Sequence, residues 1–171
     1  MSDFLMPPET ACALLAALEE HGVDVCIGGG WAIDALLGRQ TRQHADLDLW
    51  VEASGLEGLF LAFVDQGVDR IFPWPGDRPW NFVLHDARSR RVDLHLYETS
   101  ADGRLHYGSV TSPFIFDADD IASRGRIAGV EVRCERPVFA LRNHTGYPQR
   151  EVDRHDVAVL CEHFGLPRPG E

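Results

Sequence analysis

The sequence contains no lysine: all 16 basic residues among its 171 are arginine. This absence excludes a Walker A lysine, a Schiff-base lysine and a kinase-type catalytic lysine. A GC-rich genome favours arginine codons and is a sufficient cause, but the exclusions hold whatever the cause. A cationic group that clamps a polyphosphate in this protein must therefore be an arginine or a metal ion.

Cysteine is sparse, and long hydrophobic runs are missing. The four cysteines stand at positions 12, 26, 134 and 161, without the C-x-x-C spacing of a zinc or redox site. We expect Cys26 and Cys161, which stand in apolar runs, to be core residues. The N-terminus is short and acidic, unlike a signal peptide, and no apolar run approaches the length of a membrane span. These features predict a cytoplasmic protein without disulfides and without a membrane partner.

Positive charge is also in short supply, since the formal net charge is −11. A protein that binds a nucleic-acid backbone needs a basic face, so this balance argues against nucleic acid as a partner. It suits a small substrate, particularly a cationic one. The remaining composition, 44% hydrophobic and 25% charged, is typical of a globular protein with one domain, or one domain and a small helical appendage.

The densest pattern in the chain is in residues 28–48, which read GGGWAIDALLGRQTRQHADLD. It predicts a glycine turn, a short helix, a basic loop and then a strand with two aspartates. Gly28, Gly29 and Gly30 would let backbone N–H groups approach a phosphate closely at the start of the helix. This turn is the first half of a phosphate-handling site.

The two aspartates of this strand, Asp46 and Asp48, are predicted to point to the same face, because side chains alternate along a strand. Together they would supply half of a magnesium site. A D-x-D pair alone is a weak signal, and Asp117 and Asp119 form another, which we interpret as a solvated loop or a helix start. The first pair differs because a glycine turn precedes it and an apolar strand surrounds it. A phosphate cradle next to metal ligands indicates a phosphoryl or nucleotidyl transferase.

Residues 28–48 closely resemble the small antibiotic nucleotidyltransferases, which include lincosamide nucleotidyltransferases and aminoglycoside 2''-nucleotidyltransferases. These enzymes share the pattern G-G-W-x-x-D…G…R-x-H-x-D-[IL]-D and belong to the DNA polymerase β-like nucleotidyltransferase superfamily. The resemblance implies an α+β fold, with a mixed β-sheet flanked by helices and a short helical C-terminal segment. We expect residues 1–135 to form the nucleotidyltransferase core and residues 136–171 to form a helical segment packed on the same domain.

The resemblance also implies an activity: Mg²⁺-dependent transfer of a nucleoside monophosphate, with two metal ions and with ATP as the donor. The acceptor would be a hydroxyl group of a small molecule, a lincosamide or an aminoglycoside antibiotic, and the lincosamide-type relatives point to a homodimer. Two other interpretations stay open at this point. One is a minimal enzyme of antitoxin type that modifies a protein or a tRNA, and the other is a nucleotide-binding relative without catalysis.

A third carboxylate would complete a two-metal site, and Asp93 is the best candidate. It stands in RVDLHLYE, a predicted strand on which Asp93, His95 and Tyr97 share the polar face. The family places its third acidic residue on such a strand, and the segment resembles the D-I-H segment of the lincosamide enzymes. Asp93 would act as a metal ligand, as the general base, or as both. Asp86 and Glu98 are the alternatives, although both are more typical of turns.

The family pattern suggests roles for several other residues of the first segment. Arg42, and less clearly Arg39, would pair with a phosphate oxygen. His44 would contact phosphate or hold the loop by a hydrogen bond. Asp34 would pin this loop by pairing with an arginine, and Trp31 is expected to be a packing residue more than a base-stacking one.

The C-terminal stretch NHTGYPQREVDRHD (143–156) resembles the H-S-G-Y…D…D segment of the lincosamide enzymes. Its polar residues would line the substrate or nucleotide pocket, although a plain helix–loop–helix explains the glycine and proline equally well. The residues that we expect to contact substrate are His95, Tyr97, His144, Tyr147 and Asp153. An apolar wall for a sugar-like ligand would come from Trp74, Trp80 and Tyr97, for each of which core packing is the alternative.

The periodicity of the remaining sequence predicts the other elements. Helices are expected over 8–21, 54–66, 136–146 and 151–165, and strands over 23–28, 68–74 and 80–86. Residues 125–135 should form a hairpin that turns near Ala128-Gly129, and residues 99–125 should be irregular. The segment 68–74 is expected at a sheet edge because its proline cannot donate to a ladder.

Overall fold

The structure, a computed structural model, describes residues 4–73 and 80–170. Its helices are α1 (Pro8–Glu20), α2 (Gly29–Leu37), α3 (Leu56–Asp65), α4 (Pro137–Asn143) and α5 (Glu151–Phe164), with short 3-10 turns η1 (Ala53–Gly55) and η2 (Ala118–Ile121). Its strands are β1 (Val25–Gly28), β2 (Leu47–Glu52), β3 (Arg70–Pro73), β4 (Asn81–His85), β5 (Arg91–Thr99), β6 (Leu105–Tyr107), β7 (Ile115–Phe116), β8 (Ser123–Ile127) and β9 (Val130–Cys134).

The strands form one mixed sheet in the order β3-β4-β5-β2-β1-β9-β8, and β6 and β7 extend it from the end of β5. β2 runs parallel to β5 and antiparallel to β1, and β1 runs parallel to β9. β3 lies at the edge, as its proline predicts. The two strands that contain the predicted carboxylates are therefore neighbours, although a helix and a hairpin separate them in sequence.

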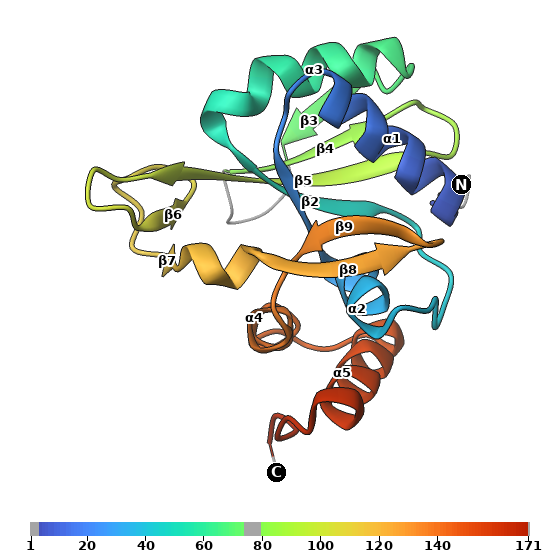
Figure 1. Cartoon of the computed structure of the whole chain (residues 1–171), viewed down its shortest axis with the longest axis vertical. Helices are drawn as coiled ribbons and strands as arrows, with labels where there is room; N and C mark the ends of the chain where they lie inside the picture. The colour runs from blue at the N-terminus through green and yellow to red at the C-terminus, as the bar shows by residue number, and fades with distance from the viewer. Residues whose placement is uncertain (1–3, 74–79, 171) are drawn as a thin grey trace.

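Helices flank this sheet in two groups (Figure 1). α1 and α3 pack together at the top of the view, whereas α4 and α5 surround α2 at the bottom. The alternation on β2 and β5 puts Leu49 and Leu94 into the main core, together with residues of α1 and α3 such as Leu18 and Phe63. Asp48 and Asp93 are consequently on the opposite face of the sheet.

The predicted helix ends follow from proline and glycine. Pro8 stands in the first turn of α1, where its missing N–H costs nothing. α2 ends at Gly38 and α5 at Gly165, and both glycines take the left-handed conformation that closes a helix. The predicted hairpin turn at Ala128-Gly129 is present between β8 and β9, with positive φ at both residues.

The sequence predicted that residues 99–125 are irregular, and this prediction is wrong. The segment contains β6, β7, η2 and the start of β8. The two strands are three and two residues long, too short for alternation to show in sequence. They form because β5 continues to Thr99 and offers its end for pairing. The second D-x-D pair opens η2, where Asp117 and Asp120 form a reciprocal capping box. It is a helix start, as expected.

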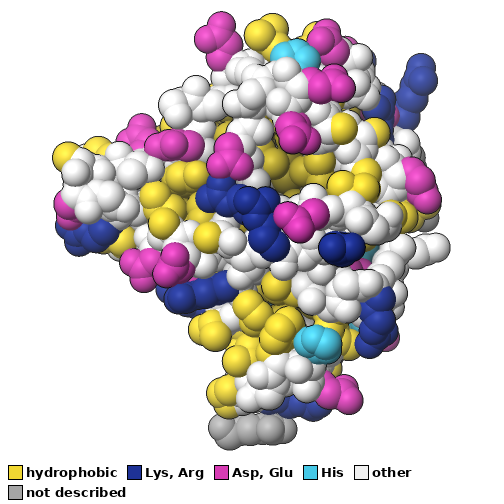
Figure 2. Space-filling model, viewed as in Figure 1, with side chains coloured by type: hydrophobic (Ala, Val, Ile, Leu, Met, Phe, Trp, Pro, Cys, Tyr) yellow, Lys and Arg dark blue, Asp and Glu magenta, His cyan; other side chains and the backbone are white. Residues whose placement is uncertain are grey.

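The surface in the view of Figure 1 mixes both signs of charge. Acidic side chains are spread over α1 and α3 at the top, and basic ones gather over β8 and β9 in the middle (Figure 2). Apolar side chains separate these groups, so this face presents no unbroken basic stripe. Within residues 4–73 and 80–170, every helix is too short or too polar to cross a membrane.

Candidate active site

The register of the sheet brings the predicted metal ligands together. Asp48 pairs with Asp93 across the parallel strands β2 and β5, and on its other side it pairs with Gly28 at the end of β1. Asp46 stands just before β2, where the charges of both other carboxylates act on it. The three predicted carboxylates thus share one corner of the sheet, next to the glycine turn.

The carboxylates of this corner repel one another in a partly buried site. Burial and the charges of Asp48 and Asp93 raise the pKa of Asp46 to about 7. Burial also raises the pKa of Asp93, against the opposing hydrogen bond from Arg91. Burial alone would raise the pKa of Asp48, but the hydrogen bond and charge of His95, aided by His144 and Arg91, lower it. The corner is therefore short of positive charge.

Two side chains on β5 hold the carboxylates in place. His95 places Nε2 3.2 Å from Oδ1 of Asp48 and Nδ1 3.0 Å from the hydroxyl of Tyr107. Arg91 donates from Nε and Nη2 to the two oxygens of Asp93, at 2.7 and 2.8 Å. Sequence analysis identified His95 but not Arg91. The available signal was that Arg91 precedes Asp93 by two residues on the same strand face.

The glycine turn is shaped by what lies against it. Gly29 has φ 59°, and a Cβ built on it would be 2.0 Å from Oδ2 of Asp48. A Cβ on Gly30 would be 2.1 Å from Nη2 of Arg42. A side chain at either position would displace a predicted functional group. The turn leads directly into α2, so its N–H groups stand at a helix N-terminus, where anions bind.

The basic loop after α2 is anchored on two buried carboxylates. Arg42 forms a bidentate ion pair with Asp156 of α5, at 2.8 and 2.6 Å. His44 is buried, and its Nε2 lies 2.6 Å from Oδ2 of Asp34; the other oxygen of Asp34, Oδ1, accepts a hydrogen bond from the hydroxyl of Thr41 at 2.6 Å. Asp34 therefore pins the loop through a histidine and a threonine, not through an arginine as the sequence suggested.

An aromatic contact completes the anchoring of this loop. Trp31 is 2% exposed and packs on the ring of His44, with centroids 4.2 Å apart. Its place between α2 and the loop is that of a packing residue. The side chain of Arg39 is exposed and forms no ion pair within the described residues, and only its backbone N–H reaches this network, donating to the carbonyl oxygen of Asp34.

The candidate substrate residues of the C-terminal segment do not share one environment. His144 is buried, and its Nε2 is 3.6 Å from Oδ2 of Asp156. Asp153 is also buried and accepts hydrogen bonds from the backbone N–H and the guanidinium of Arg150. Tyr147 is 41% exposed, and burial together with the charge of Asp153 raises its pKa to about 12. Of these residues, Tyr147 is the one that faces solvent.

The proposed apolar wall is divided between the interior and the surface. Tyr97 is 7% exposed and packs edge-on against Phe116 in an aromatic cluster. Trp80 is 39% exposed and covers Gly108, where a Cβ would be 2.1 Å from its ring. Trp74 lies outside the described residues.

A buried carboxylate that sequence analysis missed stands behind the turn. Oε1 of Glu135 accepts hydrogen bonds from Nε1 of Trp50 at 2.6 Å and from Nδ2 of Asn143 at 2.8 Å. This group ties β2, β9 and α4 together beside Gly28. Trp50 in turn stacks on His95, with centroids 4.9 Å apart.

The donor set of the corner fits a hard divalent cation in its chemistry. Three carboxylates supply oxygen ligands, which Mg²⁺ prefers, and a bound cation would relieve the repulsion that raises the pKa of Asp46. In the part of the chain that the structure describes, no three acidic, histidine or cysteine side chains are already arranged to hold an ion. Arg91 occupies both oxygens of Asp93, and His95 occupies one of Asp48. These two side chains therefore compete with a metal ion for the carboxylates.

A comparison of the whole sequence with known protein families shows which family the chain belongs to. Residues 11–160 match the model of the aminoglycoside-2''-adenylyltransferase family. The chain belongs to this family. It is accordingly a nucleotidyltransferase, as the first segment of the sequence indicated.

Individual relatives agree with this assignment. A lincosamide resistance protein of Staphylococcus haemolyticus is 24% identical over 147 residues, which cover 86% of this family member and 89% of that protein. A 2''-aminoglycoside nucleotidyltransferase of Escherichia coli is 61% identical over 36 residues, 21% of this chain and 20% of that one.

A solved structure confirms the predicted mixed sheet flanked by helices. The lincosamide antibiotic adenylyltransferase LnuA, bound to lincomycin, superposes with a TM-score of 0.74 at 23% identity, over 92% of this chain and 96% of that one. At this identity the likeness shows the fold that the two chains share.

Proposed function

We propose that this nucleotidyltransferase is a Mg²⁺-dependent adenylyltransferase that transfers AMP from ATP to a hydroxyl group of a lincosamide or aminoglycoside antibiotic. The observation that supports it most is the convergence of Asp46, Asp48 and Asp93 beside a glycine turn at a helix N-terminus. Family membership supplies the reaction class, and an ATP-consuming enzyme of this kind would work in the cytoplasm.

In this proposal Asp46, Asp48 and Asp93 would hold the metal ions. When bound, Mg²⁺ neutralises charge on the triphosphate and on the developing transition state. Gly29 and Gly30 offer backbone N–H groups to the β- and γ-phosphates at the start of α2. Arg42 adds positive charge near the turn, although its guanidinium is shared with Asp156.

The chemical step transfers one proton and exchanges one bond at phosphorus. Asp93 accepts the proton of the acceptor hydroxyl, and burial favours this because it raises the pKa of the carboxyl group. The hydroxyl oxygen forms a bond to the α-phosphorus while the bond from that phosphorus to pyrophosphate breaks. Pyrophosphate leaves with the electrons of the broken bond.

Two observations bear on the acceptor and point in different directions. The net charge of −11 attracts a polycation, which favours an aminoglycoside. The similarity of residues 91–98 and 143–156 to the lincosamide enzymes favours a lincosamide. Exposed Tyr147, close to Asp153 and Asp48, is the side chain that we expect to meet the acceptor.

The test is release of pyrophosphate from ATP in the presence of lincomycin or kanamycin. We expect one of these antibiotics to drive release in the wild-type protein with Mg²⁺, and its adenylylated product to appear by mass spectrometry. GTP in place of ATP tests the nucleobase. Asp46→Asn and Asp93→Asn should each abolish release.

Asp117→Asn is the matched control, because it alters the other D-x-D pair, which opens η2 away from the carboxylate corner. It should keep the wild-type rate. If no hydroxylated antibiotic drives pyrophosphate release, or if Asp93→Asn is as active as the wild type, the proposed function is wrong.

A further inference from the structure

Arg91 belongs to the carboxylate corner, but neither the D-x-D pattern nor the proposed reaction uses it. Its guanidinium and the carboxylate of Asp93 form a parallel, two-bond ion pair, the strongest geometry available to these groups. The side chains are 23% and 17% exposed, so water screens the pair only in part. The pair is therefore partly shielded from solvent and not a loose surface contact.

Arg91 lies where its positive charge can act on all three carboxylates of the corner. The register that pairs Leu47 with Val92 and Asp48 with Asp93 brings Asp46, one residue earlier, beside Arg91. The charges of Asp93, Asp46 and Asp48 all act on the guanidinium and raise the pKa of Arg91 against burial. One arginine thus partly neutralises all three carboxylates.

A metal ion at Asp93 and this ion pair oppose each other. Both oxygens of Asp93 already accept N–H groups of Arg91, and a divalent ion on either oxygen would face a positive guanidinium at close range.

We propose that Arg91 is an internal cation that competes with a divalent metal ion for Asp93, so that the metal binds there only when the Arg91–Asp93 pair opens. Arg91 is then a positioning residue: it keeps the corner charged and ordered without metal, and it lowers the apparent metal affinity. The inference rests on the proposed function, because it assumes that the corner is a metal site.

The experiment titrates metal-stripped protein with Mn²⁺ and follows free Mn²⁺ by electron paramagnetic resonance. The test variant is Arg91→Met, which keeps the length of the side chain and removes its charge and donors. We expect it to bind Mn²⁺ about tenfold more tightly than the wild type, because affinity scales with the fraction of molecules in the open, competent state. Arg91→Lys, which keeps the charge but not the two-bond geometry, should lie between them.

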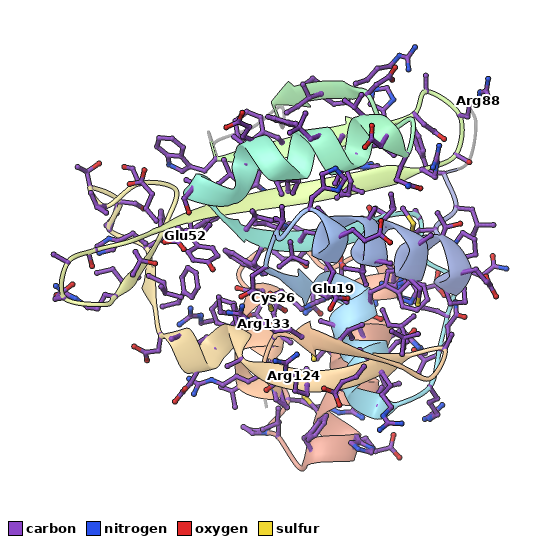
Figure 3. All side chains as sticks on the ribbon, turned by 45° about the horizontal axis from the view of Figure 1, so that its top comes forward. Glu19, Cys26, Glu52, Arg88, Arg124 and Arg133 are labelled. Atoms are coloured by element: carbon purple, nitrogen blue, oxygen red, sulfur yellow. The ribbon has the colours of Figure 1, made fainter. Side chains whose placement is uncertain are left out.

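Arg88→Met is the matched control for net charge, since it also removes one arginine. Figure 3 shows Arg88 at the outer end of the turn between β4 and β5, directed away from the protein. Its Mn²⁺ affinity should equal that of the wild type. Asp46→Asn controls for the site itself and should lose Mn²⁺ binding.

A second measurement uses thermal unfolding with and without Mn²⁺. Metal-free Arg91→Met should melt below the wild type, because its carboxylates repel one another without a cation. Saturating Mn²⁺ should remove most of this difference. A variant that had merely lost a structural contact would stay less stable with Mn²⁺ present.

The outcomes separate the inference from the proposed function. If the wild type and Arg88→Met bind Mn²⁺ and Arg91→Met binds it equally or less tightly, the inference is overturned and the metal site stands. If the wild type does not bind Mn²⁺, or if Asp46→Asn binds it unchanged, both are overturned. Should Arg91→Met not fold, Arg91→Gln is titrated in its place, with the same expected tightening.

Discussion

Gly29 stands at φ 59° at the start of α2, where a Cβ would run into the carboxylate of Asp48. Two separate reasons require glycine here, the backbone conformation and the lack of space. Only the lack of space concerns the site. A substitution that tests this crowding therefore needs a control glycine that has the left-handed backbone but no crowding. Gly38 is that control, because it has φ 68° and nothing within 4 Å of a built Cβ.

We predict that Gly29→Ala loses activity on the order of 100-fold, because a displacement of about 1 Å in a reacting group costs that much. Gly38→Ala should keep its rate and lose only about 1 kcal/mol of stability from the left-handed backbone. Pyrophosphate release and urea unfolding of both variants give the two quantities. Equal loss of activity in the two variants would contradict the crowding at Asp48.

The raised pKa of Asp46 predicts a pH dependence of stability in the metal-free protein. The folded-state pKa is about 7, above the ordinary value of 3.8, so the folded protein retains a proton that the unfolded chain has lost. The resulting stabilisation is fully present below pH 3.8 and is lost as the pH rises through 7.

Relative to Asp46→Asn, the metal-free wild type should therefore lose stability between pH 5 and pH 7, by at most about 1.4 kcal/mol per pH unit. Urea unfolding of both proteins after chelation, at several pH values, measures the difference in unfolding free energy. A difference that does not change over this range would mean that Asp46 titrates normally.

Single residues also show where sequence analysis stops. The spacing of Asp46 and Asp48 and the polar face of the 91–98 strand were sufficient to select the carboxylates that the register brings together. The Arg91–Asp93 pair was not predicted, because an arginine two residues before an aspartate has many partners open to it until the fold removes them. Glu135 was missed for a related reason: nothing local marks a glutamate that β9 and α4 enclose.

Among the elements, α5 forms an ion pair with a distant loop that the sequence of the helix does not predict. Asp156 faces inward and pairs with Arg42 of the basic loop, and His144 stands close to the same carboxylate. Burial alone would raise the pKa of Asp156, but the hydrogen bonds from Arg42 and His144 outweigh it and lower the pKa to about 2. The helix thus supplies the counter-ion of a loop more than a hundred residues earlier in the chain.

We predict that Asp156→Ala destabilises the protein by about 3 kcal/mol, because it leaves Arg42 without its buried partner. Asp69→Ala is the comparison, since its ion pair with Arg70 joins side chains that are 51% and 53% exposed. That loss should cost less than about 1 kcal/mol. Urea unfolding distinguishes the two, and similar losses would show that α5 contributes by packing alone.

Element prediction succeeded where periodicity was long and ends were marked, as in α1, α5 and the β8–β9 hairpin. It failed at β6 and β7, whose pairing depends on the length of β5 and not on any pattern of their own. The family resemblance placed a third acidic residue on a strand such as β5. The parallel pairing of β2 with β5 was not predicted, since no local signal links strands so far apart in sequence.

At the scale of the whole molecule, the negative charge sets a field that acts on the substrate before contact. An aminoglycoside has several positive charges and a lincosamide has about one, so salt should affect them differently. We predict that the KM for kanamycin rises about fivefold between roughly 50 and 500 mM NaCl, whereas the KM for lincomycin changes less than about twofold. Steady-state kinetics at both salt levels check this, and equal salt effects would remove the argument from net charge.

The ion pair between Arg42 and Asp156 has a consequence for exchange of segments between related enzymes. The end of the chain and the turn-proximal loop form one electrostatic unit, although nearly the whole sheet is encoded between them. A chimaera that takes its final helix from a relative must also bring a matching partner for position 42. Recombination within this family should therefore keep the segments that encode position 42 and α5 together and exchange what lies between them.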